Sequence, residues 1–214
     1  MVRLDRTEQR IVGVLIEKQF SVPDTYPMSE NALVSGCNQQ NNRDPITELV
    51  AFQVAGAVMS LQEKGVVARV DGGGRVPRFR HKLDEVLQLS AHELAVVAEL
   101  LLRGPQAPGA LKPRVARMGY HGTPEQIEEL LRGLSQRSPG LVEQLPLGPR
   151  ERDRRWQHRL GDGAAATPAG ESAPVVTAPM RAEPAPGGGD LAARVAALED
   201  AVRELRAELA RLSS

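Results

Sequence analysis

The sequence predicts an α+β fold that is mainly helical and carries small β hairpins. Apolar residues recur at helical spacing over most of the chain before position 161, and the pattern of the first part returns in the second. Each copy ends in two β-prone runs joined by a turn of glycine, proline and charged residues. Aromatic residues make up only 3% of the chain, so the core has to be built from Leu, Val, Ile and Ala, which suits small helical domains.

The first helix of each copy begins with the same signal. Asp5 with Glu8, and Ser90 with Glu93, have the spacing of a capping box, in which two side chains satisfy the backbone N–H groups of the first turn. Matching apolar positions follow each signal: Ile11, Val12, Leu15 and Ile16 in the first copy, and Val96, Val97, Leu100 and Leu101 in the second.

Two more helices and a hairpin are expected in the first copy. Ser29 is placed to cap a short helix. A longer helix is expected after Pro45, with Asp44 or Thr47 at its start and Gly65 at its end. Its predicted buried face is Val50, Val54, Val58 and Leu61. The stretch GVVARV-DGGG-RVPRFRH then predicts a hairpin, because Asp-Gly between β-prone runs favours a tight turn.

The second copy follows the same order. Leu111, Val115 and Met118 mark its short helix, and Pro113 is expected in the first turn of that helix, where a missing N–H costs nothing. Thr123 followed by Pro124 predicts the start of the third helix. Its predicted buried stripe is Ile127, Leu130, Leu131 and Leu134. GLVEQL and RRWQHRL form the second hairpin.

Three helices followed by a hairpin, twice over, is the tandem winged-helix pattern. The sequence therefore predicts winged-helix domains at residues 1–83 and 84–161, a disordered Ala/Pro/Gly linker at 162–189 and a coiled coil at 190–214. The coiled coil is predicted from apolar positions that are spaced alternately by four and three residues, and this spacing predicts a parallel homodimer. These positions are Leu191, Val195, Leu198, Val202, Leu205, Leu209 and Leu212.

Composition argues against several classes of protein. The net charge is zero, so binding to nucleic acid would have to come from local patches. A single cysteine and a charged start, MVRLDRTEQR, without a signal segment indicate a cytoplasmic protein, and no apolar run is long enough to cross a membrane. The four histidines lack the spacing of metal ligands. We therefore expect no cofactor, no metal and no enzymatic activity.

The segment NQQNNRDP, Asn38 to Pro45, invites two interpretations. Its amides can read adenine edges or peptide backbones, or they can cap the helices on either side. We favour the structural role and expect a local ion pair between Arg43 and Asp44. The preceding Cys37 is expected to be a buried apolar residue rather than a reactive thiol.

Charge is unevenly placed for a DNA-binding protein. The third helix of the first copy has no Lys or Arg, and that of the second opens with three glutamates, which disfavours entry into the major groove. Basic residues lie in the hairpins instead, where they can contact phosphates or can simply be solvated edge residues. These candidate contacts are Arg78, Arg80 and Lys82, and Arg150, Arg152, Arg154, Arg155 and Arg159.

Several short segments of the two copies form a distinctive signature: Glu17-Lys18, Pro23-Asp24, Tyr26-Pro27, Asn31 to Val34, Cys37 to Gln39, Asn42 to Pro45, Leu101 to Leu111 and Arg114 to Met118. This signature resembles the YceH-like family of bacterial proteins of unknown function. Gln40-Asn41 and Lys112-Pro113 depart from the usual pattern of the family. The resemblance implies tandem winged helices and a bacterial origin, but it implies no reaction.

Two functions remain open at this point. One is a DNA-binding or regulatory module that contacts the phosphate backbone through basic hairpins. The other is a scaffold that uses its winged helices to dock other proteins and does not bind DNA.

Overall fold

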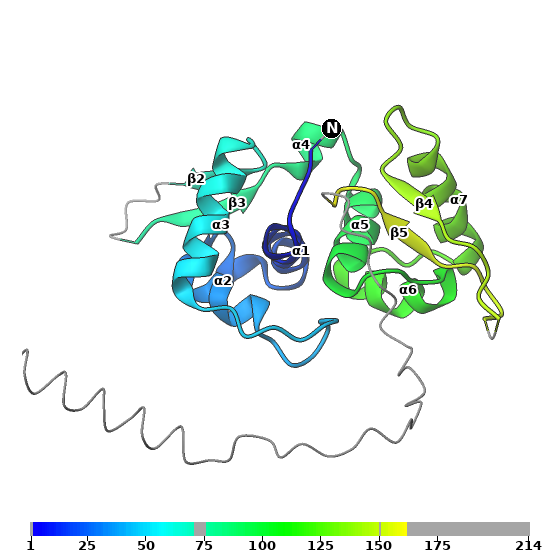
Figure 1. Cartoon of the computed structure of the whole chain (residues 1–214), viewed down its shortest axis with the longest axis horizontal. Helices are drawn as coiled ribbons and strands as arrows, with labels where there is room; N and C mark the ends of the chain where they lie inside the picture. The colour runs from blue at the N-terminus through cyan, green and yellow to red at the C-terminus, as the bar shows by residue number, and fades with distance from the viewer. Residues whose placement is uncertain (1, 71–75, 150, 162–214) are drawn as a thin grey trace, which may run out of the picture. The chain divides into compact units, whose positions relative to one another are not determined.

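The fold is a mixture of α-helices and short antiparallel strands, as the sequence predicts (Figure 1). The computed structural model describes residues 2–70, 76–149 and 151–161. The chain divides into two units, Met1–Thr167 and Pro168–Ser214, and every described residue belongs to the first. The predicted linker (162–189), the predicted coiled coil (190–214) with its homodimer, and Arg150 lie outside the described residues.

The described residues of the first copy form three α-helices and a three-stranded antiparallel sheet in the order β1-β3-β2. Asp5 and Glu8 form the predicted capping box, and the Ser29 hydroxyl accepts the N–H of Ala32 as predicted. The elements are α1 (Arg6–Ser21), a 3₁₀ turn (Pro23–Thr25), β1 (Met28–Ser29), α2 (Glu30–Cys37), α3 (Ala51–Glu63), β2 (Val67–Val70) and β3 (Arg78–His81).

After a short connecting helix, the second copy again has three helices followed by a hairpin, but its named strands form a two-stranded sheet. Ser90 and Thr123 cap helices as predicted, each within a capping box. The elements are α4 (Leu83–Leu87), α5 (Ala91–Arg103), α6 (Pro108–Val115), a 3₁₀ turn (Ala116–Met118), α7 (Pro124–Ser135), β4 (Val142–Gln144) and β5 (Trp156–His158), and β4 pairs with β5 antiparallel.

Two predicted helix boundaries are wrong. Helix α3 starts at Ala51, not near Pro45, because Asn38 ties the preceding segment down: its amide donates to the Leu49 carbonyl over 2.7 Å and accepts the Leu49 N–H over 2.8 Å. Pro113 lies inside α6 rather than in its first turn, because Pro108 already occupies the start of that helix. In both places the helix starts away from the proline on which the prediction was based.

The two copies share one core. Helix α1 packs against α5, and the Leu4 N–H donates to the Leu160 carbonyl over 2.8 Å, which ties the start of the first copy to the end of the second (Figure 1). Gly13 makes the helix contact possible, since a Cβ there would lie 2.8 Å from Cγ of Leu102. Within the described ranges no helix is long and apolar enough to span a membrane.

His81 at the end of β3 is buried, and it predicts a pH-dependent stability. Its side chain faces Asp84, whose Oδ1 lies 3.4 Å from Nδ1, with Arg80 and Glu85 also acting on its charge. Burial lowers the pKa of His81 to about 4, against the raising effect of Asp84. As the pH falls, the His81 imidazole is protonated in the unfolded chain at a higher pH than in the folded one. The contribution of neutral His81 to the free energy of unfolding is therefore fully present above about pH 6.5, and about 3 kcal/mol of it is lost as the pH falls towards about 4.

The measurement is urea unfolding of wild-type protein and of His81→Phe between about pH 7 and pH 4. We expect the loss at low pH to be reduced by about 3 kcal/mol in His81→Phe. His121→Gln is the matched control, because His121 is exposed. Equal acid sensitivity of wild type and His81→Phe contradicts this account.

Candidate functional site

The basic residues of the first hairpin are engaged with other groups. Arg80 donates to a carboxylate oxygen of Glu85 over 2.8 Å, and Lys82 lies 3.3 Å from the other oxygen of the same carboxylate. Arg78 donates to the Pro27 carbonyl over 2.8 Å. The predicted alternation around buried Phe79 is present in β3, but Glu85 on α4 lies between the two cations that were expected to meet phosphate.

Three of the predicted arginines of the second hairpin, Arg154, Arg155 and Arg159, also have partners. Arg155 pairs with Glu151 at 2.7 Å, and Arg159 with Glu143 at 3.7 Å. Arg154 donates to the Gln144 side chain over 3.3 Å. A phosphate group would have to compete with these acceptors, and the competition lowers the electrostatic gain on binding. The predicted core residues of this strand, Trp156 and Leu160, are buried.

Two of these arginines help to line a cavity of about 430 Å³ beside the second hairpin. Arg152 and Arg155 meet two further arginines there, Arg103 at the end of α5 and Arg114 on α6. The cavity is not purely basic, because three carboxylates line it as well. These are Asp44, Glu151 and Asp153.

Part of the exposed side of α3 is apolar, which could not be seen from the predicted buried stripe alone. Phe52 is 77% exposed and Met59 64% exposed, and Gly56 lies between them on the same side of the helix. We call Phe52, Gly56 and Met59 the α3 face. Val50 was predicted to be buried, but it is 47% exposed. Phe52 and Met59 are apolar residues that lie outside the predicted buried face of this helix, and this could have indicated an exposed apolar surface.

The loop after α2 has a structural role. Arg43 pairs with Glu17 of α1 at 2.7 Å, and both side chains are buried. The expected pair of Arg43 with Asp44 is therefore wrong: Asp44 is exposed and its N–H binds the Leu102 carbonyl. Burial raises the pKa of Glu17, but the hydrogen bond and charge of Arg43 outweigh it, so the net pKa is lowered. The amide of Asn42 accepts from Arg103 over 2.7 Å and links the copies.

A second buried carboxylate lies on α5. Burial raises the pKa of Glu99, although Arg117 at 3.3 Å and Arg103 at 3.7 Å oppose that effect. Cys37 is buried as predicted, and burial raises the pKa of its thiol to about 12, which disfavours the thiolate. Within the described residues no group of three or more His, Cys, Asp and Glu side chains is arranged to hold a metal ion.

Comparison with known proteins gives consistent matches. The family model described as "Protein of unknown function, DUF480" matches residues 4–153. A UPF0502 protein of Geotalea daltonii is 44% identical over 180 residues, which cover 84% of this chain and 82% of that protein. A UPF0502 protein of Azoarcus sp. is 40% identical over 210 residues, covering 98% and 89%, and one of Saccharophagus degradans is 36% identical over 217 residues, covering 99% and 97%.

Proposed function

The chain belongs to the DUF480/UPF0502 family of bacterial proteins, and we propose that it is a non-enzymatic tandem winged-helix protein that docks an amphipathic helix of a partner protein on the α3 face. The order of elements supports the winged-helix assignment: α1, α2 and α3 precede the β2–β3 hairpin, and α5, α6 and α7 precede the β4–β5 hairpin. In this arrangement the third helix is the element that such domains commonly present to a partner. Because the fold alone does not assign function, the proposal rests on the surface of α3.

The exposure of Phe52 and Met59 carries the proposal. Covering one large apolar side chain is worth about 1.5–3 kcal/mol, so two of them on one helix side provide a binding anchor. Helix α3 contains no Lys or Arg, and its one charged residue is Glu63. A surface of this kind gains little from phosphate and much from an apolar partner.

The charges around the α3 face indicate the chemistry of the partner. Glu48 precedes the helix in sequence and Glu63 ends it, so acidic residues flank the face along the chain. A Cβ added at Gly56 would meet nothing within 4 Å, so Gly56 places no side chain between Phe52 and Met59. The best match is an amphipathic helix with apolar residues at helical spacing and a Lys or Arg at each end.

The experiment uses full-length protein and a fluorescent designed peptide of this type, with a scrambled peptide of the same composition. We expect Phe52→Asp with Met59→Asp to weaken binding by about thirtyfold or more, because both anchors are lost. Val86→Asp is the matched control, since Val86 is an apolar residue on α4 that is 41% exposed. Both substitutions lie at the surface, so thermal unfolding should be nearly unchanged.

Several results would overturn the proposal. Equal affinity for the scrambled peptide, or no effect of the double substitution, would remove the α3 face as a docking site. Self-association of wild-type protein that the double substitution abolishes would mean that a second copy occupies the face. Binding of mixed-sequence duplex DNA that depends on Arg152, Arg154 and Arg155, and not on α3, would favour the DNA-binding alternative instead.

A further inference from the structure

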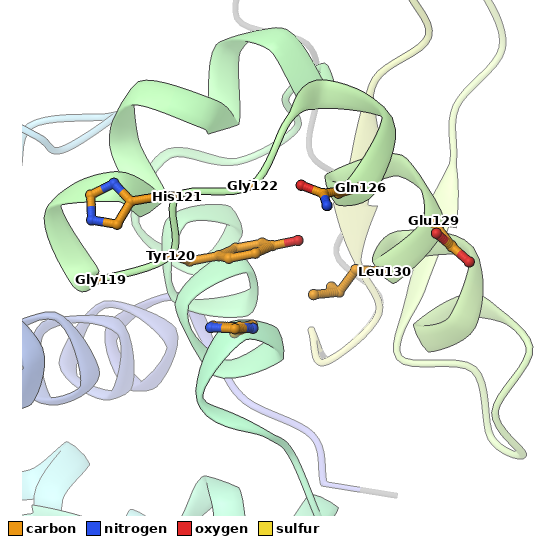
Figure 2. Close-up of a pocket in the computed structure, with 8 residues that line it drawn as sticks. Gly119, Tyr120, His121, Gly122, Gln126, Glu129 and Leu130 are labelled. Carbon is orange, nitrogen blue, oxygen red and sulfur yellow. The ribbon is translucent and has the colours of Figure 1, made fainter.

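A second surface feature is a cavity of about 580 Å³ in the second copy, far along the sequence from the α3 face (Figure 2). It lies between the start of α5, the turn that precedes α7, and α7 itself. Its size is within the range of small-molecule sites. The lining residues are His92, Gly119, Tyr120, His121, Gly122, Gln126, Glu129 and Leu130.

The turn holds Tyr120 in one position. Gly119 adopts a left-handed backbone conformation with φ of 85°, and the Tyr120 N–H donates to the Val115 carbonyl over 3.1 Å. The ring stacks on His92 with the centroids 4.4 Å apart. Gly122 passes so close that a Cβ there would lie 2.7 Å from Cζ of Tyr120. Two glycines and a stacked ring therefore fix the direction of the tyrosine.

The fixed ring directs its hydroxyl towards α7. Figure 2 shows the Tyr120 oxygen on the side where Gln126, Glu129 and Leu130 lie, whereas His121 lies on the opposite side. This end of the cavity therefore offers a hydroxyl, an amide, a carboxylate and an apolar side chain.

The charge of the cavity is negative at neutral pH. Glu129 is its carboxylate, and none of the described residues that line it is Lys or Arg. Burial raises the pKa of Tyr120, and the negative charge of Glu129 adds to this effect. The carboxylate of Glu129 would repel an anionic ligand here.

We propose that this cavity binds a guanidinium or ammonium group on an aliphatic chain. Glu129 pairs with the positive charge, and the Tyr120 hydroxyl accepts a hydrogen bond from its N–H groups, whereas the Gln126 amide oxygen already accepts the Thr123 N–H over 2.8 Å. Leu130 packs against the methylene groups. Such a group can belong to a small amine or to an Arg or Lys side chain of a partner protein. The site is independent of the proposed function, because it shares no residue with the α3 face.

The test is titration of isotope-labelled full-length protein, followed by amide chemical shifts in NMR. The probes are agmatine, which is a free guanidinium amine, and an Ala-Arg-Ala peptide with blocked ends; a citrulline peptide is their neutral counterpart. We expect saturable shifts at Tyr120, Gly122 and Gln126 with the two charged probes and none with the citrulline peptide. Tighter binding of agmatine indicates a small amine, and tighter binding of the arginine peptide indicates a protein side chain.

Two substitutions distinguish specific binding in this cavity from non-specific attraction of a cation to the acidic helix α7. Glu129→Gln should weaken binding about tenfold, because it removes the charge and keeps the shape. Glu125→Gln is the matched control: Glu125 lies on the same helix and is exposed, but it does not line the cavity. The α3 double substitution should leave these shifts unchanged, so failure of the α3 proposal does not affect this one. The proposal is wrong if no probe gives saturable shifts, or if Glu129→Gln and Glu125→Gln weaken binding equally.

Discussion

Arg43→Ala is expected to lower the free energy of unfolding by about 3–5 kcal/mol at neutral pH, because it leaves the buried carboxylate of Glu17 without its hydrogen-bonded partner and with the more distant Lys18 ammonium at 3.6 Å. The side chain of Glu17 is 8% exposed and that of Arg43 is fully buried, so water cannot replace the lost 2.7 Å contact. The Arg43 Nε–H also donates to the Gly36 carbonyl at the end of α2, over 3.0 Å. The change is measured by urea unfolding of both proteins, with the same dependence of the unfolding free energy on urea concentration used in both fits.

A double-mutant cycle separates the ion pair from lost packing. Glu17→Gln in the Arg43→Ala background should recover part of the stability, because the neutral amide is cheaper to bury than the carboxylate. Asp44→Ala, at the exposed neighbouring position, should cost less than about 1 kcal/mol. If Arg43→Ala costs no more than Asp44→Ala, Arg43 behaves as a surface residue and the buried pair is refuted.

Local sequence signals predicted the starts of four helices because the groups involved lie within a few residues of one another. The capping residues Asp5, Ser29, Ser90 and Thr123 each accept a backbone N–H three positions later, so neighbouring residues suffice to identify them. The start of α3 did not follow this rule. Its position depends on Asn38 binding Leu49 across a loop, and nothing in the sequence around Pro45 indicates that contact.

The partner of Arg43 could not be predicted for the same reason. Asp44 is adjacent in sequence, whereas Glu17 is brought close only when α1 and α2 pack together. The basic hairpins show a similar limit. Alternation along a strand correctly places Phe79 inside and Arg78 outside, but it gives no information on Glu85, which reaches Arg80 from the following helix.

One of the two candidate binding surfaces could have been predicted from the sequence, and the other required the folded structure. Phe52 and Met59 could have been recognised as exposed by comparing them with the buried stripe of α3. The cavity beside Tyr120 could not, since His92 belongs to the first helix of its copy and stacking requires the whole helical core. The family match adds no function to these surfaces, so each depends on its own test.

Gly13→Val is expected to destabilise the fold by about 3 kcal/mol, although glycine is otherwise a poor residue for a helix interior. Gly13 lies in the middle of α1 where that helix meets α5. A Cβ at this position would lie 2.8 Å from Cγ and 2.9 Å from Cδ2 of Leu102, and 3.3 Å from Cβ of Leu101. Overlap with two buried side chains of a neighbouring helix forces the helices apart, and urea unfolding measures the cost.

The sign of the stability change in Gly13→Ala tests whether overlap with Leu102 is the cause of the destabilisation. Gly13→Ala in wild-type protein sets a helix-propensity gain of about 1 kcal/mol against the same overlap, and we expect a net loss. In a Leu102→Ala background the overlapping Cγ and Cδ2 atoms are absent, so Gly13→Ala should become neutral or stabilising. Gly133→Ala on α7 is the matched control, because a Cβ there meets nothing within 4 Å and only the propensity gain remains. If Gly13→Ala stabilises wild-type protein as much as Gly133→Ala does, α1 and α5 are not in close contact at Gly13.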